Sequence, residues 1–268
     1  MALLAAALFG ISTPLVQRFG AGLGPFTTAA LLYLGAAVVA LVSRQHASKE
    51  APLTRSDMPR LLAMAATGAV IGPVALAWGL QRTSGASASL MLTLEALFTA
   101  VLAGGVLLVL EQGLAGQVQL LGLLAVMVAT AAWGVDNTLS RGVAERDPGQ
   151  VVWVKALLGC VATLTLAWLM GEPWPAWGAA LALLSIGASG YGLSLRFYLL
   201  AQRAFGAGRT GSVFAFAPFI GVLGAFALGD RSASAFMTVA ARCCGCRCDS
   251  APLPGLPIPR GVRTASMI

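Results

Sequence analysis

The sequence predicts an all-α integral membrane protein, a polytopic bundle of helices. Hydrophobic residues make up 58% of the chain and charged residues only 10%, and the mean hydropathy is +0.84. The apolar residues come in blocks of about twenty, which is the length of a bilayer-spanning helix. The blocks lack the ten-residue alternation of a membrane barrel, and open strand edges cannot lie in hydrocarbon. Helices are therefore the expected form of every block.

Eight blocks are long and apolar enough to cross a membrane. They cover residues 2–19, 25–43, 60–80, 87–110, 118–139, 151–170, 178–201 and 211–229. The first block has no basic residue before its apolar run, so we expect a helix of the mature protein and not a cleaved signal peptide. The longest internal linker, residues 44–59, is rich in basic residues and should lie in the cytoplasm.

Small residues recur inside these blocks and are expected to permit close helix crossings. The clearest groups are Gly68 with Gly72, and Gly187 with Ser189 and Gly190. The alternative is that these groups have no packing role, because glycine is abundant throughout the chain, with 32 copies.

The chain contains an internal repeat. The stretch from Gln81 reads QRTSGASASLMLTLEALFTAV, and the stretch from Gln202 reads QRAFGAGRTGSVFAFAPFIGV. The starts of the two halves also match loosely, as ALFGISTPLVQR from Ala7 and AAWGVDNTLSR from Ala131, and Pro25 corresponds to Pro148. Secondary transporters are commonly built from two such repeats, with the solute site where the repeats meet near the bilayer midplane.

Three stretches resemble the EamA-like permeases of the drug/metabolite transporter superfamily. They read GASASLMLTLEALFTAV, AAWGVDNTLSRGVAERDPGQVVWVKALLG and GYGLSLRFYLLAQRAFGAGRTGSVFAFAPFIGVLGAFALGD, and the resemblance covers most of residues 1–230. It implies a ten-helix carrier made of two five-helix repeats of opposite orientation. Such a carrier moves small metabolites through a central cavity by alternating access.

The chain departs from the family pattern in its first half. The run LTLEALFTA resembles the front of the fourth family helix, and VLAGGVLLVL resembles the back of the fifth, yet here they are joined. About one helix is therefore predicted to be missing, which leaves about eight helices and an incomplete first repeat, residues 1–117.

The distribution of basic residues supports this interpretation, because cytoplasmic loops collect Lys and Arg. Eight simply alternating spans give no clear bias. Restoring one crossing between Arg82 and Arg141 leaves only Arg18 and Arg82 on one side. The other side then holds Arg44, Lys49, Arg55, Arg60, Arg141, Arg146, Arg203 and Arg209.

The second departure is at the C-terminus. The second repeat, residues 118–230, should continue into a last helix, but residues 231–268 contain no helix-length apolar run. Their alanine-, glycine- and arginine-rich composition is typical of coding sequence read out of frame, so we expect a disordered tail.

Few polar residues interrupt the apolar blocks, and these are the candidate substrate-binding residues. Glu95 is the only ionisable group between residues 90 and 110, and a charge at mid-helix costs about 2.5–3.5 kcal/mol, so it should face the bundle interior. Glu95 either contacts solute or is protonated or paired only to satisfy itself. The other candidates are Asp136, Asn137, Lys155, Arg196, Trp133 and Tyr191. Snorkelling to the interface is the alternative for the charged members, and packing is the alternative for the aromatic ones.

Enzyme chemistry has little support. The single histidine, His46, lies in a loop without a nucleophile in any known arrangement, and no glycine loop ends in the Lys-Ser/Thr pair that holds a nucleotide. Four of the five cysteines lie close together in the tail, without the second, distant pair typical of a zinc site. They are Cys243, Cys244, Cys246 and Cys248. We therefore expect no catalytic residue, no metal and no cofactor.

The predicted function is a secondary transporter, either a permease or an exporter, of small metabolites or amino-acid-like solutes, driven by an ion or solute gradient. The alternative is an inactive membrane remnant of such a permease. The expected location is the inner (cytoplasmic) membrane, as a multi-pass protein. The expected partners are membrane lipids and a small-molecule solute, with a homodimer left open. The net charge of +7 comes from the loops and the tail, and does not predict nucleic-acid binding.

Overall fold

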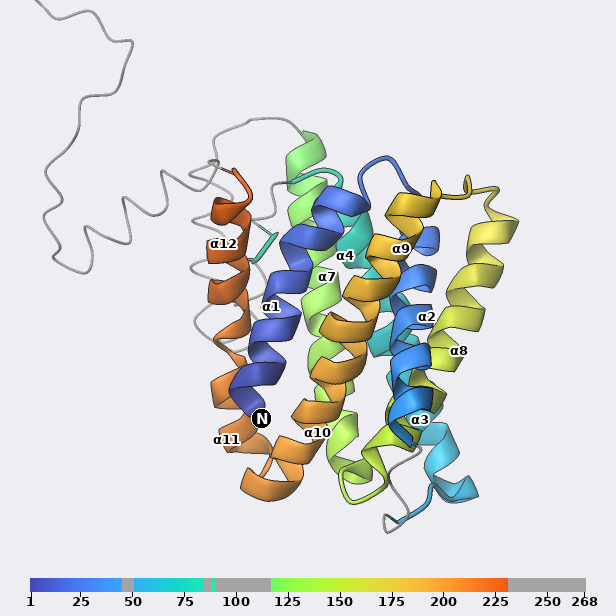
Figure 1. Ribbon diagram of the computed structural model, residues 1–268, viewed down its shortest axis with the longest axis vertical. Helices are drawn as coiled ribbons and strands as arrows, with labels where there is room; N and C mark the ends of the chain where they lie inside the picture. The colour runs from blue at the N-terminus through green and yellow to red at the C-terminus, as the bar shows by residue number, and fades with distance from the viewer. Residues whose placement is uncertain (45–50, 84–87, 90–116, 231–268) are drawn as a thin grey trace, which may run out of the picture. The chain divides into compact units, whose positions relative to one another are not determined.

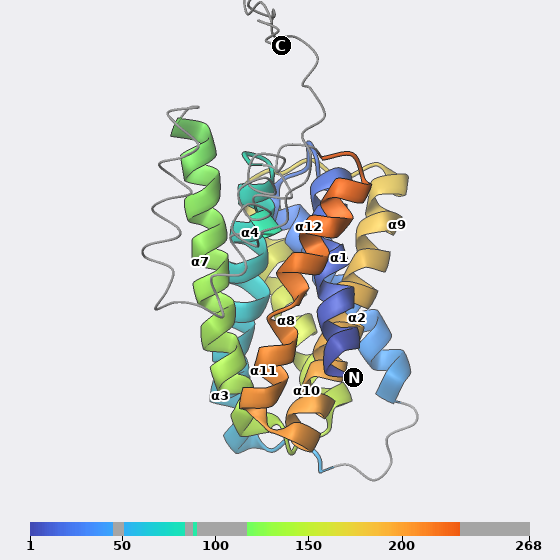
Figure 2. The ribbon, with the colours of Figure 1, turned by 90° about the vertical axis from the view of Figure 1, so that its left-hand side faces the viewer.

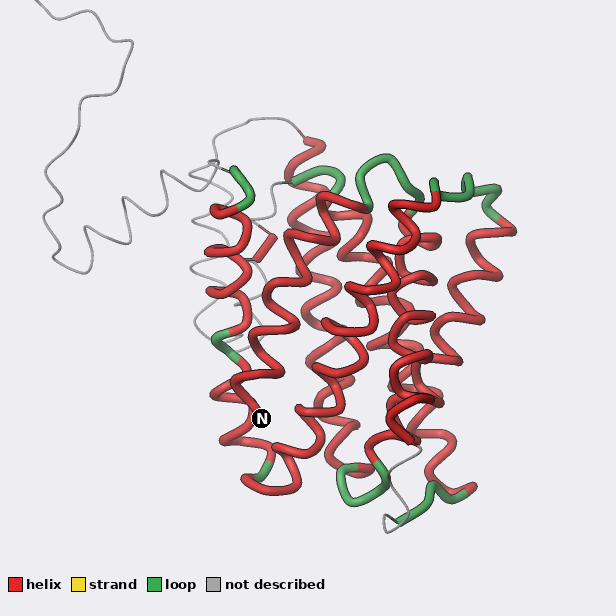
Figure 3. Tube along the Cα trace, viewed as in Figure 1, coloured by secondary structure: helices red, strands yellow, loops and turns green. Residues whose placement is uncertain are grey.

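The structure is a computed structural model that describes residues 1–44, 51–83, 88–89 and 117–230. Every regular element in this part of the chain is a helix (Figure 3), and the only strand-like feature is an isolated bridge between Ala51 and Arg146. The predicted all-α class is confirmed. The segment 90–116, which contains Glu95 and the junction at which one helix is predicted to be missing, and the tail 231–268 lie outside the described residues.

The helices follow the predicted spans closely. The first half contains α1 (Ala2–Phe19), α2 (Pro25–Arg44), the 3-10 turn η1 (Arg55–Asp57), α3 (Met58–Met64), η2 (Ala65–Ile71) and α4 (Gly72–Leu80). The second half contains α7 (Gln117–Ser140), the 3-10 turn η4 (Arg141–Val143), α8 (Pro148–Leu169), α9 (Trp177–Ile186), η5 (Gly187–Leu193), α10 (Ser194–Phe205), α11 (Ala207–Phe214) and α12 (Ala217–Ala227). Seven helices in the described residues are long and apolar enough to cross a membrane. The eighth predicted span, residues 87–110, is almost entirely outside them.

The long span of each half is interrupted by one π-helical segment, η2 in the first half and η5 in the second. Helices α3, η2 and α4 form one continuous span, and α9, η5 and α10 form the other (Figures 1 and 2). A π-segment pairs each carbonyl with the amide five residues ahead, and it often marks a functional site. The hydropathy pattern predicts both spans but neither irregularity.

Both π-segments lie where neighbouring helices cross closely. A Cβ atom on Gly187 would lie 2.0 Å from the backbone carbonyl oxygen of Leu32, and one on Gly68 would lie 2.3 Å from the carboxyl carbon of Asp136. A Cβ at either distance would force a neighbouring group to move, so the predicted close crossing is confirmed at Gly68 and Gly187. The prediction for Ser189 is not tested.

The contacts between helices follow the same pattern in both halves. Helices α2 and α8 pack against each other, α2 contacts η5, and α8 contacts η2. Likewise α1 packs on η5 and α7 packs on η2. Each half therefore places its first two helices against the π-segment of the other half.

One end of the helices carries most of the described basic residues. Arg146, just before α8, forms an ion pair with Asp57 at 3.0 Å, and Arg60 donates to the carbonyl of Gly142 at 3.0 Å. Arg203 donates to the carbonyl of Arg146 at 2.7 Å. These contacts bring basic residues of both halves to one end, as the restored family layout predicts.

The opposite end of α8 carries exposed tryptophans. Trp168, Trp174 and Trp177 are 75%, 76% and 86% exposed. Tryptophan is enriched at membrane–water interfaces, where its ring lies at the level of the headgroups. The described helices thus have a basic end and an aromatic end.

Candidate functional site

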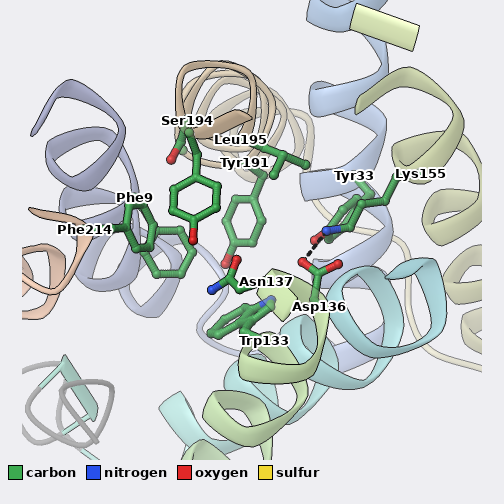
Figure 4. A pocket seen from close by; sticks show the side chains of 12 residues that line it. Phe9, Tyr33, Trp133, Asp136, Asn137, Lys155, Tyr191, Ser194, Leu195 and Phe214 are labelled. Atoms are coloured by element: carbon green, nitrogen blue, oxygen red, sulfur yellow. Dashed lines mark hydrogen bonds and ion pairs between the residues drawn. The ribbon is translucent and has the colours of Figure 1, made fainter. Parts of the chain in front are cut away.

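A cavity of about 60 Å³ lies among α1, α2, α7, α8, η5, α10 and α11. Phe9, Tyr33, Trp133, Asp136, Asn137, Lys155, Gly190, Tyr191, Ser194, Leu195, Tyr198 and Phe214 line it (Figure 4). Both halves of the chain contribute side chains. The volume is enough for several water molecules or for a small polar group.

A buried ion pair forms one side of the cavity. Nζ of Lys155, on α8, lies 2.5 Å from Oδ2 of Asp136, on α7, and the two side chains are 3% and 5% exposed. A buried charge is strongly unfavourable unless it is paired, so each residue requires the other. The second carboxylate oxygen, Oδ1 of Asp136, is buried and has no hydrogen-bond partner among the described residues.

The carbonyl group of Gly68 lies beside this pair because of the π-segment η2. In this segment the amide of Gly72 donates to the carbonyl of Thr67, five residues back. The residue five positions after Gly68 is Pro73, which has no N–H to donate. The carbonyl of Gly68 is therefore free to accept hydrogen bonds from side chains.

Two aromatic side chains donate hydrogen bonds to this carbonyl. The hydroxyl of Tyr33 and the indole Nε1 of Trp133, the latter at 3.0 Å, both donate to the carbonyl of Gly68. A buried carbonyl left without a partner would be costly, and these bonds hold the two rings in fixed positions. The first half thereby fixes aromatic walls around the ion pair of the second half.

The rest of the wall is a cluster of aromatic rings. Phe9 contacts Trp133 edge to face with ring centroids 5.3 Å apart, and Tyr33 contacts Tyr191 in the same way at 5.6 Å. In Figure 4 the ring of Tyr191 points its hydroxyl toward Asn137. This hydroxyl is buried and has no hydrogen-bond partner in the described part of the chain. The cavity thus combines apolar ring faces with polar atoms that can still accept or donate.

Most of the predicted site residues meet here. The five that line the cavity are Trp133, Asp136, Asn137, Lys155 and Tyr191. Arg196 does not line it, and its guanidinium instead donates to the carbonyl of Ser43 at 3.5 Å. Glu95 lies outside the described residues. A substrate-binding role for all seven stays a prediction.

Sequence reasoning missed several cavity residues, chiefly Phe9, Tyr33 and Phe214. One signal could have found Phe9: in the repeat alignment it corresponds to Trp133, which was already a candidate. The Gly68 carbonyl could not be found in this way, because its availability depends on a π-register that hydropathy does not encode.

Metal binding has no visible basis in this part of the chain. The described residues contain no group of three or more His, Cys, Asp or Glu side chains that could hold a metal ion. His46 and the four clustered cysteines of the tail lie outside them.

Comparison with protein families identifies the chain. Residues 1–109 and 120–242 both match the EamA-like transporter family. The chain belongs to this family. This EamA-like transporter is therefore an integral, multi-pass membrane protein of the drug/metabolite transporter superfamily, and a permease rather than an enzyme. A comparison with curated proteins found no match.

Proposed function

We propose that this EamA-like transporter is a secondary transporter of small metabolites or amino-acid-like solutes that works by alternating access. The solute site is the cavity around Asp136 and Lys155. The observation that carries the proposal is a buried ion pair with an unpartnered carboxylate oxygen, facing a cavity lined by both halves. Ionisable residues inside membrane spans are costly and usually mark a solute or ion path.

The reciprocal helix contacts support a two-repeat mechanism. Residues 1–117 and 118–230 are the proposed repeats, and each packs its first two helices on the π-segment of the other. In transporters of this construction, access alternates when one repeat moves against the other around a fixed central site. A cavity lined by side chains of both repeats is where such motion would change exposure.

Polar contacts between the two proposed repeats at the basic end would close the path to the cavity from that side. The amide of Leu53 donates to Oε1 of Gln150 at 3.0 Å, and the amide of Asp147 donates to the carbonyl of Ala51 at 2.9 Å. Together with the Asp57–Arg146 pair, they join the proposed repeats near the water interface. Interactions so close to solvent are individually weak, so they can break in each cycle. We place the basic end in the cytoplasm and the protein in the inner membrane.

Flux through proteoliposomes tests the proposal. Purified protein is reconstituted, and uptake of a radiolabelled panel of amino acids and small organic acids is measured with and without an imposed proton or sodium gradient. Saturable uptake is expected, and the double variant Asp136→Asn with Lys155→Met should reduce it strongly.

The matched control is Thr165→Val. Thr165 is also on α8 and is exposed, and its hydroxyl donates to the carbonyl of Val161 in the same helix at 2.8 Å. It should leave uptake unchanged. If uptake equals that of empty liposomes while the protein is demonstrably inserted, the inactive-remnant alternative is favoured.

A further inference from the structure

We propose that the Asp136–Lys155 pair selects solutes by their net charge. The cavity takes small solutes of net charge zero, which are zwitterions or uncharged polar molecules, and it excludes single-charged cations and anions. The inference rests on the proposed function, because it names the class of solute that this site would carry.

The selection follows from counting charges. Among the described residues that line the cavity, Asp136 and Lys155 are the two that carry charge at neutral pH, and their charges sum to zero. The other lining side chains are uncharged: six aromatic side chains, three of them tyrosines with a hydroxyl, one amide, one serine hydroxyl and one aliphatic group. Against these described residues, a solute of net charge plus or minus one would therefore leave one charge without a counter-charge.

An uncompensated charge is penalised here because the pair is largely removed from solvent. Both members of the pair are at most 5% exposed, and the small cavity beside them is lined mainly by aromatic side chains. Taking an ion out of water into such surroundings is strongly unfavourable unless an opposite charge and hydrogen bonds replace the water. A solute with no net charge avoids this penalty.

A zwitterion also fits the free hydrogen-bonding positions. Its ammonium group can donate to Oδ1 of Asp136, which has no partner among the described residues, and can lie against a ring face. Its carboxylate can accept from Lys155, whose ammonium has three donors and uses one for Asp136. The unpartnered hydroxyl of Tyr191 supplies a further contact.

The positions of Tyr33 and Trp133 keep the pair available for the solute. Both side chains donate to the carbonyl of Gly68 and not to Asp136. The Gly68 carbonyl therefore acts as a positioning group: it holds two donors of the wall away from the carboxylate oxygen that the solute would use.

Changing one charge should change the preferred solute. Lys155→Met leaves a net charge of minus one, which favours a monocation, and Asp136→Asn leaves plus one, which favours a monoanion. The reciprocal swap, Asp136→Lys with Lys155→Asp, restores zero. Lys155→Arg keeps the charge and should keep the preference.

Three solutes of nearly equal size probe this rule. Alanine is a zwitterion, lactate replaces its ammonium by a hydroxyl, and alaninol replaces its carboxylate by a hydroxymethyl group. For each variant, the shift in unfolding temperature in detergent reports binding, and uptake into proteoliposomes reports transport. Elution as a single species on size-exclusion chromatography identifies the variants that fold.

The wild-type protein should prefer alanine over both charged analogues by at least about tenfold, since each factor of ten is a modest free-energy difference for a buried charge. Lys155→Met should prefer alaninol, and Asp136→Asn should prefer lactate. The swap and Lys155→Arg should prefer alanine. Should one single variant fail to fold, the other still carries the test, because each single variant is expected to change the preferred solute, and the swap and Lys155→Arg are the charge-neutral controls.

Several outcomes overturn the inference. They are binding of lactate or alaninol by the wild-type protein as well as alanine, no binding of alanine at all, and an unchanged preference in folded single variants. A changed charge preference on Glu95→Gln would also overturn the two-residue count. Charge-selective binding without uptake in any variant would instead overturn only the proposed transport.

Discussion

The two π-segments meet equivalent helices of the opposite half, yet they meet different chemistry. A Cβ on Gly190 of η5 would lie 2.5 Å from the Cβ of Ser12 on α1, and one on Gly68 of η2 would lie 2.3 Å from the carboxyl carbon of Asp136 on α7. Ser12 and Asp136 correspond in the repeat alignment. The hydroxyl of Ser12 donates within its own helix, to the carbonyl of Phe9, whereas Asp136 reaches across to Lys155.

This difference shows how a duplicated frame can hold a single polar site. Close packing needs only a small side chain at each crossing, and both halves supply it. A second buried ion pair would double the desolvation cost and bring no further specificity for one small solute. The duplication thus preserves the packing, and at these two crossings the charged residues belong to the second half.

The largest expected effect comes from adding a methyl group where Gly68 of η2 crosses Asp136 of α7. Gly68→Ala places a methyl group against the Asp136 carboxylate and forces it away from Lys155. Breaking a buried pair costs about 3–5 kcal/mol, so the folded bundle should lose stability on that scale. Gly190→Ala meets only the uncharged Ser12 and should cost about 1–3 kcal/mol, as overpacking does.

Thermal unfolding in detergent measures both variants. Gly134→Ala, on α7, is the control, because nothing lies within 4 Å of its added Cβ. Equal losses for Gly68→Ala and Gly190→Ala would show that the charge makes no difference between the two crossings.

The next effect concerns the carbonyl that the first π-segment releases. Tyr33→Phe removes one donor to Gly68 and should cost about 1 kcal/mol. Trp133→Phe removes the other donor and also part of a buried ring, so it should cost more. Removing both leaves a buried carbonyl without a side-chain donor, so the double variant should cost more than the sum. Denaturant titration measures the three variants, and strictly additive costs would contradict the shared-acceptor interpretation.

The two halves also differ at Pro73, because Leu195 occupies the corresponding position after the second π-segment. Pro73→Ala supplies an amide five residues after Gly68, so the carbonyl gains a donor within its own helix. In that background Tyr33→Phe should lose most of its cost, which gives a coupling of about 1 kcal/mol in a double-mutant cycle. A coupling near zero would mean that the missing proline amide is not what frees the carbonyl.

The smallest effect is expected at the N-terminus of α2. Its Phe26 and Thr27 amides donate to the Glu172 carboxylate of the second half, at 3.2 and 2.6 Å, whereas α8 is capped locally by Asp147. Glu172→Gln keeps an acceptor but removes the charge at the helix terminus, so it should cost about 0.3–1 kcal/mol. The loss should shrink in high salt. A salt-independent loss in calorimetry would point to lost packing instead.

The positions of the membrane spans could be predicted from the sequence, because the thickness of the bilayer sets the length of each apolar block. The predicted 2–19 and 25–43 agree with α1 and α2 to within a residue or two. The pairing of Asp136 with Lys155 could not be predicted in the same way. The two residues were both candidates, but they lie on different helices, and which polar residues meet depends on how those helices pack.

Arg196 shows the limit of the same reasoning. It is polar and within a predicted span, as the cavity residues are, but its long side chain reaches the carbonyl of Ser43 in the last turn of α2. Flexible cations near helix ends can leave the interior in this way, whereas shorter residues such as Asp136 cannot. Hydropathy alone does not separate the two cases.

The exposed tryptophans at the end of α8 make intrinsic fluorescence a probe of how the protein lies in the membrane. Trp168, Trp174 and Trp177 should emit from headgroup depth, while Trp133 is buried within the bundle. Lipids brominated at known carbons would quench the first three according to their depth. Insertion of the protein, and tilting of that end during a transport cycle, can therefore be followed without attaching a dye.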